Sequence, residues 1–386
     1  MILFILTFVA VYCLMHALVF WGMHPLLSSH RALPGLIWGW MGLMILSPLL
    51  IRLLDRNGYP TAARSLAWVS YCWMGLLFLA FSLFLLVAVV HLLALATHRL
   101  LPNLPLLTLH RPAVSGLVLL LTLAAGLYGV YEATDLRVEE IRLVTDKLPP
   151  GRDQLRIAQI SDLHLGLLHR GEVLAPVLNE LQRLQPDLLV ATGDIVDGQM
   201  DHLAPLSEAL RRFEPPLGKY AVTGNHEYYA GLDHALDFLE QCGFILLRNE
   251  GVSPAGQLTL VGMDDPEGGP LPDEAQILAD NTQGLFTLLL KHRPVVEETS
   301  IGLFDLQLSG HAHRGQIFPF NLLTAIPYPL QDGLYPLSGG GWLYTNRGTG
   351  SWGPPMRILA PPEISLFVIR RGQEAVTGRQ SEERQD

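Results

Sequence analysis

The sequence has little cysteine. Its 386 residues include Cys13, Cys72 and Cys242 and no others. No two of these have the spacing of a metal-binding or redox pair, and a disulfide framework needs a larger, even number. Cysteine chemistry is therefore excluded as the basis of function, and we interpret all three as packing residues.

Charge is almost absent from the first third of the chain. Up to Glu132 there are six arginines, no lysine and two acidic residues, a formal charge of +4, whereas the remainder has 20 basic and 34 acidic residues, or −14. An acidic second part excludes non-specific nucleic-acid binding, which gains its affinity from Lys and Arg that neutralise phosphates. We expect no nucleic-acid partner, and a phosphate group would need cations to bind here.

Four long apolar stretches occupy the part that lacks charge. They run over about 1–21, 36–54, 66–96 and 113–130, and crossing a bilayer takes about 20 helical residues. The first stretch lacks the basic start and the cleavage site of a secretory signal, so we interpret it as an anchor. The pattern predicts an integral membrane protein with a four-helix transmembrane region over residues 1–134, in contact with the lipid bilayer.

A transport function is disfavoured because no Asp, Glu, Lys or Arg lies at the centre of these stretches, and coupled transport normally uses such residues. His16 and His91 are then packing residues, and the tryptophans are interfacial anchors or packing residues. Four crossings place both ends on one side of the membrane, where six basic residues flank the spans against three on the other side. The positive-inside rule therefore predicts a cytoplasmic C-terminal part.

The hydrophobic pattern changes after residue 134. Residues 135–152 regain charge and end at Pro149-Pro150-Gly151, so we predict a linker there, a domain over 153–372 and a disordered polar tail over 373–386. Within the domain, short apolar runs such as 155–160 alternate with amphipathic segments such as 172–184, as strands and helices do. This alternation predicts an α/β domain with more strands than one small sheet needs.

Five polar clusters each follow a short apolar run that is typical of a buried strand. Loops that leave the carboxyl ends of strands are where α/β sheets place ligands and catalytic groups. Each histidine taken alone is more often a surface or hydrogen-bonded core residue, but one fold must bring this ordered set to one edge. The clusters are Asp162-Leu163-His164, Gly193-Asp194-Ile195-Val196-Asp197, Gly224-Asn225-His226-Glu227, Lys291-His292 and Gly310-His311-Ala312-His313.

The order of these clusters resembles the calcineurin-like metallophosphoesterase superfamily over residues 153–370. The resemblance implies two packed mixed β-sheets flanked by helices. The later segments Arg347-Gly348-Thr349-Gly350 and Pro361-Pro362-Glu363-Ile364, with Arg357, are similar to the bacterial membrane-associated branch that includes UDP-diacylglucosamine pyrophosphatase-like phosphoesterases. That branch implies a bacterial inner-membrane protein.

The resemblance also implies a role for each site residue. His226 would be the general acid and Asp197 would orient it, while Glu227 would hold the loop. Arg314 stands where branch members often have glycine, and it could bind a substrate phosphate or point to solvent. One metal ion would be bound by Asp162, His164, Asp194 and His313, and the other by Asp194, Asn225, His292 and His311.

A ligand set of imidazole, carboxylate and amide without thiolate suits two divalent ions of Mn, Fe or Zn, with Mg less natural. Such a pair lowers the pKa of a shared water and offsets charge on phosphate oxygens. The implied function is hydrolysis of phosphodiester or pyrophosphate bonds by a metal-bridging hydroxide, on a phosphoester substrate that is lipid-linked or nucleotide-linked. The alternative is a non-catalytic, metal-bound membrane scaffold or sensor. The sequence predicts no oligomeric state.

Two further features concern the substrate. Gly198 follows Asp197 where the protein Ser/Thr phosphatases of the superfamily have arginine, which disfavours a phosphoprotein substrate. The run 318–330 has too much proline for a regular helix or strand and is too apolar for an ordinary loop. It either folds back into the core or forms an apolar rim that binds lipid chains beside the metals.

Overall fold

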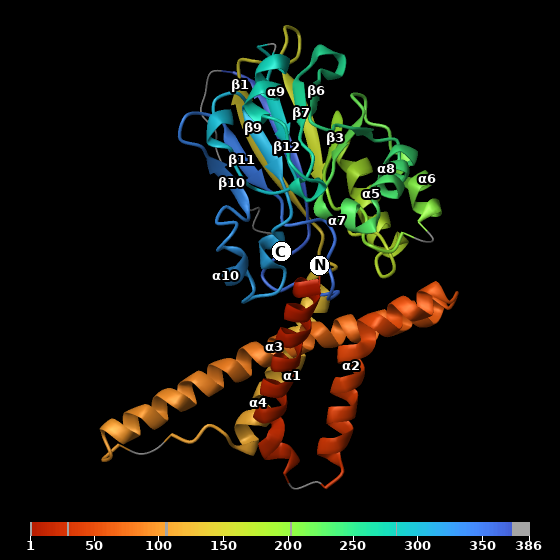
Figure 1. Cartoon of the computed structure of the whole chain (residues 1–386). Coiled ribbons are helices and arrows are strands. Elements are labelled where there is room, and N and C mark those ends of the chain that lie inside the picture. The colour runs from red at the N-terminus through yellow and green to blue at the C-terminus, as the bar shows by residue number, and fades with distance from the viewer. Residues whose placement is uncertain (1, 29–30, 105–106, 201–202, 283, 373–386) are drawn as a thin grey trace. The chain divides into compact units, whose positions relative to one another are not determined.

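The computed structural model describes residues 2–28, 31–104, 107–200, 203–282 and 284–372. The predicted polar tail, residues 373–386, lies outside the described residues. The chain divides into two compact units (Figure 1). The helical unit comprises Met1–Tyr131 with Gly353–Ile358, and the α/β unit comprises Glu132–Trp352 with Leu359–Asp386.

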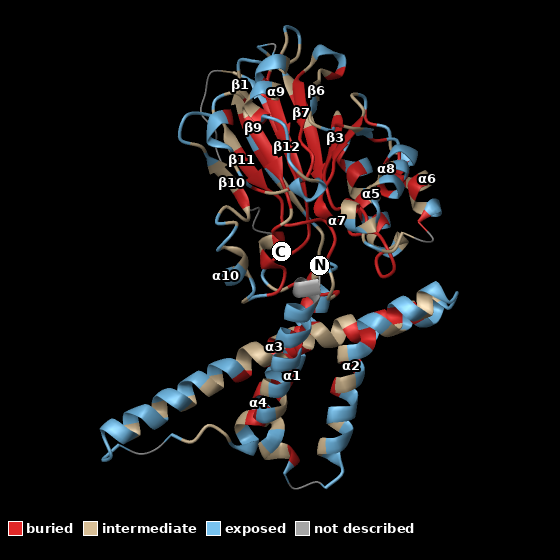
Figure 2. Ribbon diagram, in the orientation of Figure 1, coloured by how far each residue is buried: buried red, intermediate tan, exposed pale blue. Residues whose placement is uncertain are grey.

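Four long apolar helices form the helical unit. They are α1 (Ile2–Leu27), α2 (Leu33–Arg56), α3 (Pro60–Leu100) and α4 (Pro112–Glu132). Each is long and apolar enough to cross a membrane, yet at most 28% of the residues in any apolar window are buried. Figure 2 shows this as long exposed faces on the helices. Apolar surface on this scale is typical of helices in contact with lipid, and the four predicted apolar helices are confirmed.

Helix α3 is longer than its predicted span. It has 41 residues, or about 60 Å at about 1.5 Å per residue, which is about twice the hydrocarbon thickness of a bilayer. The predicted stretch 66–96 lies inside it. Polar residues at both ends, including Arg64, His98 and Arg99, are also helical, so the helix extends beyond the apolar run.

The fully buried polar residue His16 of this unit is satisfied by its neighbours. Its Nδ1 lies 2.8 Å from the carbonyl oxygen of Tyr12, and its Nε2 accepts a hydrogen bond from Trp73 at 3.0 Å. Both ring nitrogens thus have partners, which agrees with the interpretation of His16 as a packing residue.

The α/β unit contains two six-stranded sheets within the described residues. The first has the order β1 (Arg137–Thr145), β12 (Glu363–Arg371), β2 (Gln154–Ile160), β3 (Leu188–Thr192), β4 (Lys219–Val222), β5 (Ile245–Leu246). The second has the order β10 (Gly333–Pro336), β11 (Trp342–Thr345), β9 (Leu306–Ser309), β8 (Thr287–Leu290), β7 (Thr259–Gly262), β6 (Glu250–Val252).

The two sheets pack face to face through one apolar core. Side chains such as Ile157 and Val190 of the first sheet share this core with Leu288 and Leu308 of the second. The helices α5 (Gly171–Leu184), α6 (Ala204–Arg211) and α8 (Leu232–Gln241) cover the outer face of the first sheet, and α9 (Glu274–Asn281) packs on the second. Figure 2 shows the central strands as buried. The predicted fold of two packed mixed sheets flanked by helices is confirmed.

Parallel pairing brings the predicted clusters to one edge. Strands β2, β3 and β4 run parallel to one another, as do β7, β8 and β9. The loops after β2, β3, β4, β8 and β9 therefore leave from carboxyl ends, which lie together in each sheet. The short helix α7 (Asn225–Ala230) begins within the loop after β4.

The predicted linker over 135–152 is wrong in its central part. Residues Arg137–Thr145 form β1, the edge strand of the first sheet, which pairs in parallel with β12. Its charged residues made the segment resemble a linker, but charge on an exposed edge strand is a common device against edge-to-edge association. Ile141 and Leu143 are the two residues of β1 that are buried.

Candidate metal centre

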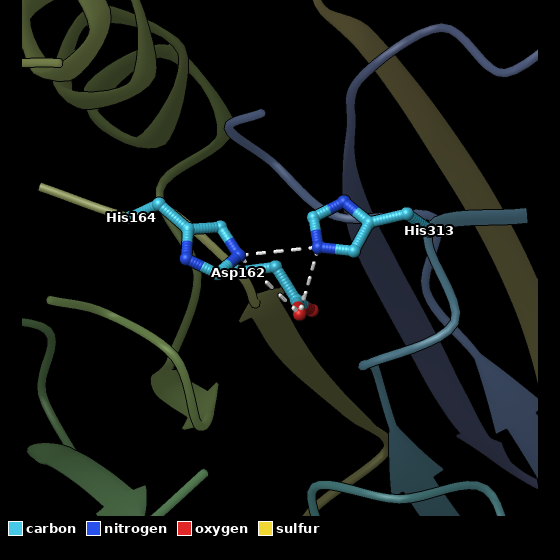
Figure 3. Close-up of side chains that lie close together, drawn as sticks. All are labelled: Asp162, His164 and His313. Carbon is cyan, nitrogen blue, oxygen red and sulfur yellow. Dashed lines mark hydrogen bonds and ion pairs between the residues drawn. The ribbon is translucent and has the colours of Figure 1, made fainter. Parts of the chain in front are cut away.

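Asp162, His164 and His313 form the first group of metal-binding side chains. Asp162 and His164 lie in the loop after β2, and His313 lies in the loop after β9. His313 Nε2 is 3.2 Å from Asp162 Oδ1 and 3.1 Å from His164 Nε2 (Figure 3). Two imidazole nitrogens and a carboxylate oxygen thus converge on one point.

Asp194, His292 and His311 form the second group. His292 Nε2 lies 3.2 Å from Asp194 Oδ2 and 3.1 Å from His311 Nδ1. On the other side of the His292 ring, Nδ1 lies 2.8 Å from the carbonyl oxygen of Thr192. A backbone acceptor at this position fixes the tautomer and directs the lone pair of Nε2 inward, as is usual for histidines that bind metals.

The two groups adjoin each other. Asp194 Oδ2 of the second group lies 4.0 Å from His164 Nε2 of the first. Asp162 in turn accepts the backbone N–H of His311, at 3.1 Å to its nearer oxygen. Asp194 therefore stands between the groups, where the sequence predicts the shared ligand.

Asn225 is a predicted ligand that belongs to neither of these two groups. It is the first residue of α7, and the backbone N–H of the next residue, His226, donates to Asp194 at 2.8 Å. The side-chain oxygen of Asn225 is buried, and it accepts no hydrogen bond from the described residues. A buried polar oxygen without a partner costs roughly 1–3 kcal/mol, and a cation would remove that cost.

The backbone at the site is strained. Asp162, His164, Asp194, His311 and His313 all have φ between 48° and 68°. This left-handed conformation costs a residue other than glycine roughly 1–2 kcal/mol, and clusters of such residues are typical of functional sites. Five ligand candidates in this strained conformation indicate that the loop backbone serves to direct these side chains, at a cost in stability.

Two glycines of the polar clusters, Gly193 and Gly310, stand where neighbouring loops leave no room for a side chain. Gly193 has φ of 89°, and a Cβ atom there would lie 2.7 Å from His292 Nδ1. A Cβ atom on Gly310 would overlap Ser161 and Asp162. Each glycine precedes a ligand candidate because only a residue without a side chain allows neighbouring loops to approach so closely.

The electrostatics of the site hold several ligand candidates in the form that binds cations, with His292 as the exception. Burial and the charges of neighbouring histidines lower the pKa of His164 and of His311 to about 3, so both rings are neutral. Burial alone would raise the pKa of Asp162, but His313 and His292 hold it below its usual range. Neutral imidazoles and ionised carboxylates are the forms that bind metal. Burial lowers the pKa of His292, but the charge and hydrogen bond of Asp194 outweigh burial and raise it to about 10, so a cation would displace a proton from this ring.

His226 is placed as a general acid should be. Its Nδ1 lies 2.9 Å from Asp197 Oδ1, and its ring packs edge-on against His164 with centroids 4.6 Å apart. Burial lowers the pKa of His226, but the hydrogen bond that its Nδ1–H donates to Asp197 and the charges of Asp194 and Asp197 outweigh burial and raise the pKa to about 9. A nitrogen of His226 also lies within 4.8 Å of ligand atoms of Asp194 and His164.

Arg314, the residue after His313, is paired with an acidic side chain. Its side chain, 40% exposed, forms an ion pair of 3.2 Å with Asp332, and Arg347 lies 3.6 Å from the same carboxylate. An arginine held in this way has less freedom to reach a phosphate. Substrate binding by Arg314 stays a prediction.

The sequence did not reveal several residues that support the site. Ser161 donates to Asp162 at 2.5 Å, and Thr192 supplies the carbonyl that orients His292. Arg293 forms two hydrogen bonds of 2.8 Å with Asp265. Their adjacency to ligand candidates was the available signal for Ser161 and Arg293, but the partners of Thr192 and Arg293 depend on tertiary contacts.

Comparison with known proteins identifies the family. Residues 155–315 match the family described as calcineurin-like phosphoesterase. An uncharacterized metallophosphoesterase of Aquifex aeolicus is 40% identical over 252 residues, which cover 64% of this chain and 96% of that protein. The chain belongs to the calcineurin-like metallophosphoesterases. It is a metal-dependent phosphoester hydrolase by family, with a dinuclear divalent metal centre and a phosphoester substrate.

Other relatives agree on the domain and differ in extent. A transmembrane protein with metallophosphoesterase domain from Danio rerio is 31% identical over 273 residues, which cover 66% of this chain and 62% of that protein. The chain thus spans less than two thirds of that relative. A 5′-nucleotidase precursor from Thermus thermophilus matches in structure over 56% of this chain and 54% of that one, with 14% identity and a TM-score of 0.34. A likeness of this size carries no argument about function.

The donor set fits the metal centre that the family implies. In each group, two imidazole nitrogens face each other at 3.1 Å, a separation that a single proton or cation bridges. The unpartnered oxygen of Asn225 adds a neutral donor, and the described centre contains no thiolate. This combination suits divalent ions of intermediate softness.

Proposed function

We propose that this protein hydrolyses phosphodiester or pyrophosphate bonds at the membrane surface. One observation carries the proposal: His226, held by Asp197, adjoins the metal-binding carboxylate Asp194. A proton donor beside a cation site is the arrangement that phosphoester cleavage needs, because the leaving oxygen must gain a proton as the phosphorus is attacked. Two divalent cations at the site would activate water and offset charge on the phosphate.

The residues divide this work by position. Asp162, His164 and His313 would hold one cation, Asn225, His292 and His311 would hold the other, and Asp194 would serve both. His226 donates the proton to the leaving group, and Asp197 keeps the ring oriented and charged. The carboxylate partner matters because it raises the pKa of the imidazole above that of an exposed histidine. Mn, Fe or Zn suits these ligands better than Mg.

The apolar run 318–330 supports a lipid-linked substrate. The run contains the short helix α10 (Asn321–Thr324), a regular turn that the proline content did not predict. Five of its large apolar side chains are 42% to 78% exposed, so these five do not form core: Phe318, Phe320, Leu322, Leu323 and Ile326. We define these five residues as the apolar rim. Exposed apolar residues on this scale mark binding surfaces.

The segment 318–330, which carries the apolar rim, is close to the metal centre along the chain and in space. Gly315, two residues after His313, packs so closely on Asn321 that a Cβ atom there would overlap the Asn321 backbone. The Tyr328 ring lies edge-on to His311 with centroids 4.9 Å apart. Acyl chains on the rim would thus place an attached phosphate near the metals, consistent with the predicted branch of phosphoesterases that act on lipid-linked nucleotides.

Hydrolysis by the full-length protein in detergent tests the proposal directly. With added Mn²⁺, a chromogenic phosphodiester should be cleaved, and a chelator should abolish cleavage that Mn²⁺ then restores. Protein that binds two metal ions per chain but turns over no phosphodiester, pyrophosphate or phosphomonoester would instead support the scaffold or sensor. A reporter fused after Asp386 tests the proposed cytoplasmic side, and activity of a reporter that requires export would reverse the orientation.

A further inference from the structure

Two half-exposed aromatic side chains adjoin the proposed general acid. The ring of Tyr229 lies 5.3 Å from that of His226, and the ring of Trp352 lies 5.9 Å from it, both in edge-to-face contact. Tyr229 is 58% exposed and Trp352 is 52% exposed. Neither ring is needed to fill the core, and so much aromatic surface beside a catalytic group needs another explanation.

The backbone of Trp352 is fixed by one buried side chain. The Gln316 amide donates from Nε2 to the carbonyl oxygen of Trp352 at 2.8 Å and accepts from the Trp352 N–H at 2.9 Å. Gln316 is 8% exposed and lies three residues after His313. The loop that carries a metal ligand therefore also sets the position of the indole.

Tyr229 lies beside a separate group of charged side chains. Burial and the negative charge of the nearby Glu267 raise the pKa of the Tyr229 hydroxyl, and Glu267 lies 3.6 Å from Arg293. Arg293 follows the ligand candidate His292 and is anchored by its paired hydrogen bonds to Asp265. Ordinary surface aromatics have no such supports, whereas preorganised binding groups do.

We propose that Trp352 and Tyr229 form a stacking subsite for a leaving group that carries a planar aromatic ring, either a nucleobase or another aryl group. The inference rests on the proposed hydrolase function. A general acid must come within about 2.6–3.2 Å of the leaving oxygen, so a leaving group in contact with His226 lies against these two rings. Stacking of flat rings on aromatic side chains contributes to affinity in nucleic-acid complexes and tolerates different bases, because every base has a π-face.

The test compares two methyl phosphodiesters whose leaving groups have similar pKa but different shape, meta-chlorophenyl and hexafluoroisopropyl. Full-length wild-type protein should show the higher kcat/KM on the aryl ester. Trp352→Leu and Tyr229→Leu should each lower kcat/KM on the aryl ester about 5-fold to 10-fold, mostly through KM, and leave the fluoroalkyl ester within about 2-fold. Trp352→Phe should retain most of the preference, because a smaller flat ring remains.

Ile245→Ala is the matched control, since Ile245 is 50% exposed and lies on the edge strand β5. It should change neither ester. Inhibition by adenosine but not by ribose identifies a nucleobase as the natural ring, and inhibition by neither points to another aryl group.

Equal losses on both esters in Trp352→Leu, with lower thermal stability, would show a packing role and overturn the inference. Unchanged kinetics with weaker retention in membranes would also overturn it, because Trp352 would then be an interfacial anchor. Either outcome leaves hydrolysis itself standing. Absence of turnover on both esters and on a pyrophosphate in wild-type protein is the distinct result that removes the proposed function.

Discussion

The Glu227 carboxylate accepts the backbone N–H of Asp194 at 2.9 Å. It also accepts the N–H groups of Ile195 and Val196, at 2.8 and 3.3 Å, and of Gly224 at 2.6 Å. One fully buried side chain thus holds the loop after β3 to the loop after β4, as the sequence analysis expected of it. The strained φ of 53° at Asp194 is sustained by these bonds.

Glu227→Gln should therefore destabilise the α/β unit without touching the metals directly. The amide keeps one acceptor oxygen but turns an NH₂ group toward backbone donors, and each buried donor left unpaired costs about 1–3 kcal/mol. Chemical denaturation should show a loss of that order, together with weaker metal retention. Glu240→Gln, on the exposed face of α8, is the control and should lose neither. Wild-type stability in Glu227→Gln would contradict the role.

Asp194→Asn should abolish hydrolysis and loosen both metal ions. A neutral amide bridges two cations poorly and leaves their like charges facing each other without an intervening negative charge. Metal analysis of the purified protein, beside the exposed control Asp237→Asn, measures the effect. Two ions per chain and normal turnover in Asp194→Asn would show that the two groups do not share this ligand.

His226→Ala should keep its metals and lose turnover by about 10²-fold to 10⁴-fold, the usual range for a general acid. The loss should shrink for esters with good leaving groups, since these need less protonation. Metal analysis tests the first expectation, and turnover of a series of esters with different leaving groups tests the second. A collapse of metal content would instead assign His226 as a ligand, which its distance from Asp194 and His164 allows.

Asp197→Asn should change the pH dependence rather than the metal content. The general acid works while His226 is protonated, so activity is present below its pKa and falls as pH rises through that value. Without the carboxylate, the raised pKa of His226 falls back. The alkaline limb of kcat/KM on an ester with a poor leaving group should move to lower pH. An unmoved limb would mean that another group sets it.

Replacing Phe318, Phe320, Leu322 and Leu323 of the apolar rim with serine should separate two kinds of substrate. Turnover of a small soluble phosphodiester should stay near the wild-type value, because these exposed side chains support little of the core. Turnover of a micellar lipid phosphoester or lipid-linked nucleotide should fall, since the apolar surface that binds its chains is gone.

Serine at Ile245 and Leu271, which are exposed but lie outside the apolar rim, controls for general loss of apolar surface. Equal losses on both substrates in the rim variant, with a lower melting temperature, would show a structural role and leave the lipid-linked substrate without this support.

The α/β fold and its predicted site residues were readable from the sequence because their signals are local. Strands such as Leu188–Thr192 are short buried runs whose length and composition differ from those of helices. Each ligand candidate follows such a run directly, so the position of Asp194 or His292 in a loop needed no tertiary information. The four apolar helices were equally clear, because a bilayer imposes a length that no other environment requires.

The tertiary structure decided what depends on distant partners. Strand β1 became visible only through its pairing with β12, more than 200 residues later, because its charged exposed face hid the alternation of Ile141 and Leu143. The exposure of the apolar rim could not be read either, since apolar composition is the same for core and for a binding surface.

The surroundings of His226 show most clearly what the sequence predicts and what depends on the tertiary structure. Its motif predicted an acid and an orienting carboxylate, and the fold brings Asp197 within 2.9 Å. Trp352 carries no local signal, because it reaches His226 only when the loops after β9 and β11 meet through Gln316. The sequence by itself determined which chemical groups are present, since those are covalent properties of the chain. Which groups share a face, and which remain open to a substrate, was decided by packing between segments far apart in sequence.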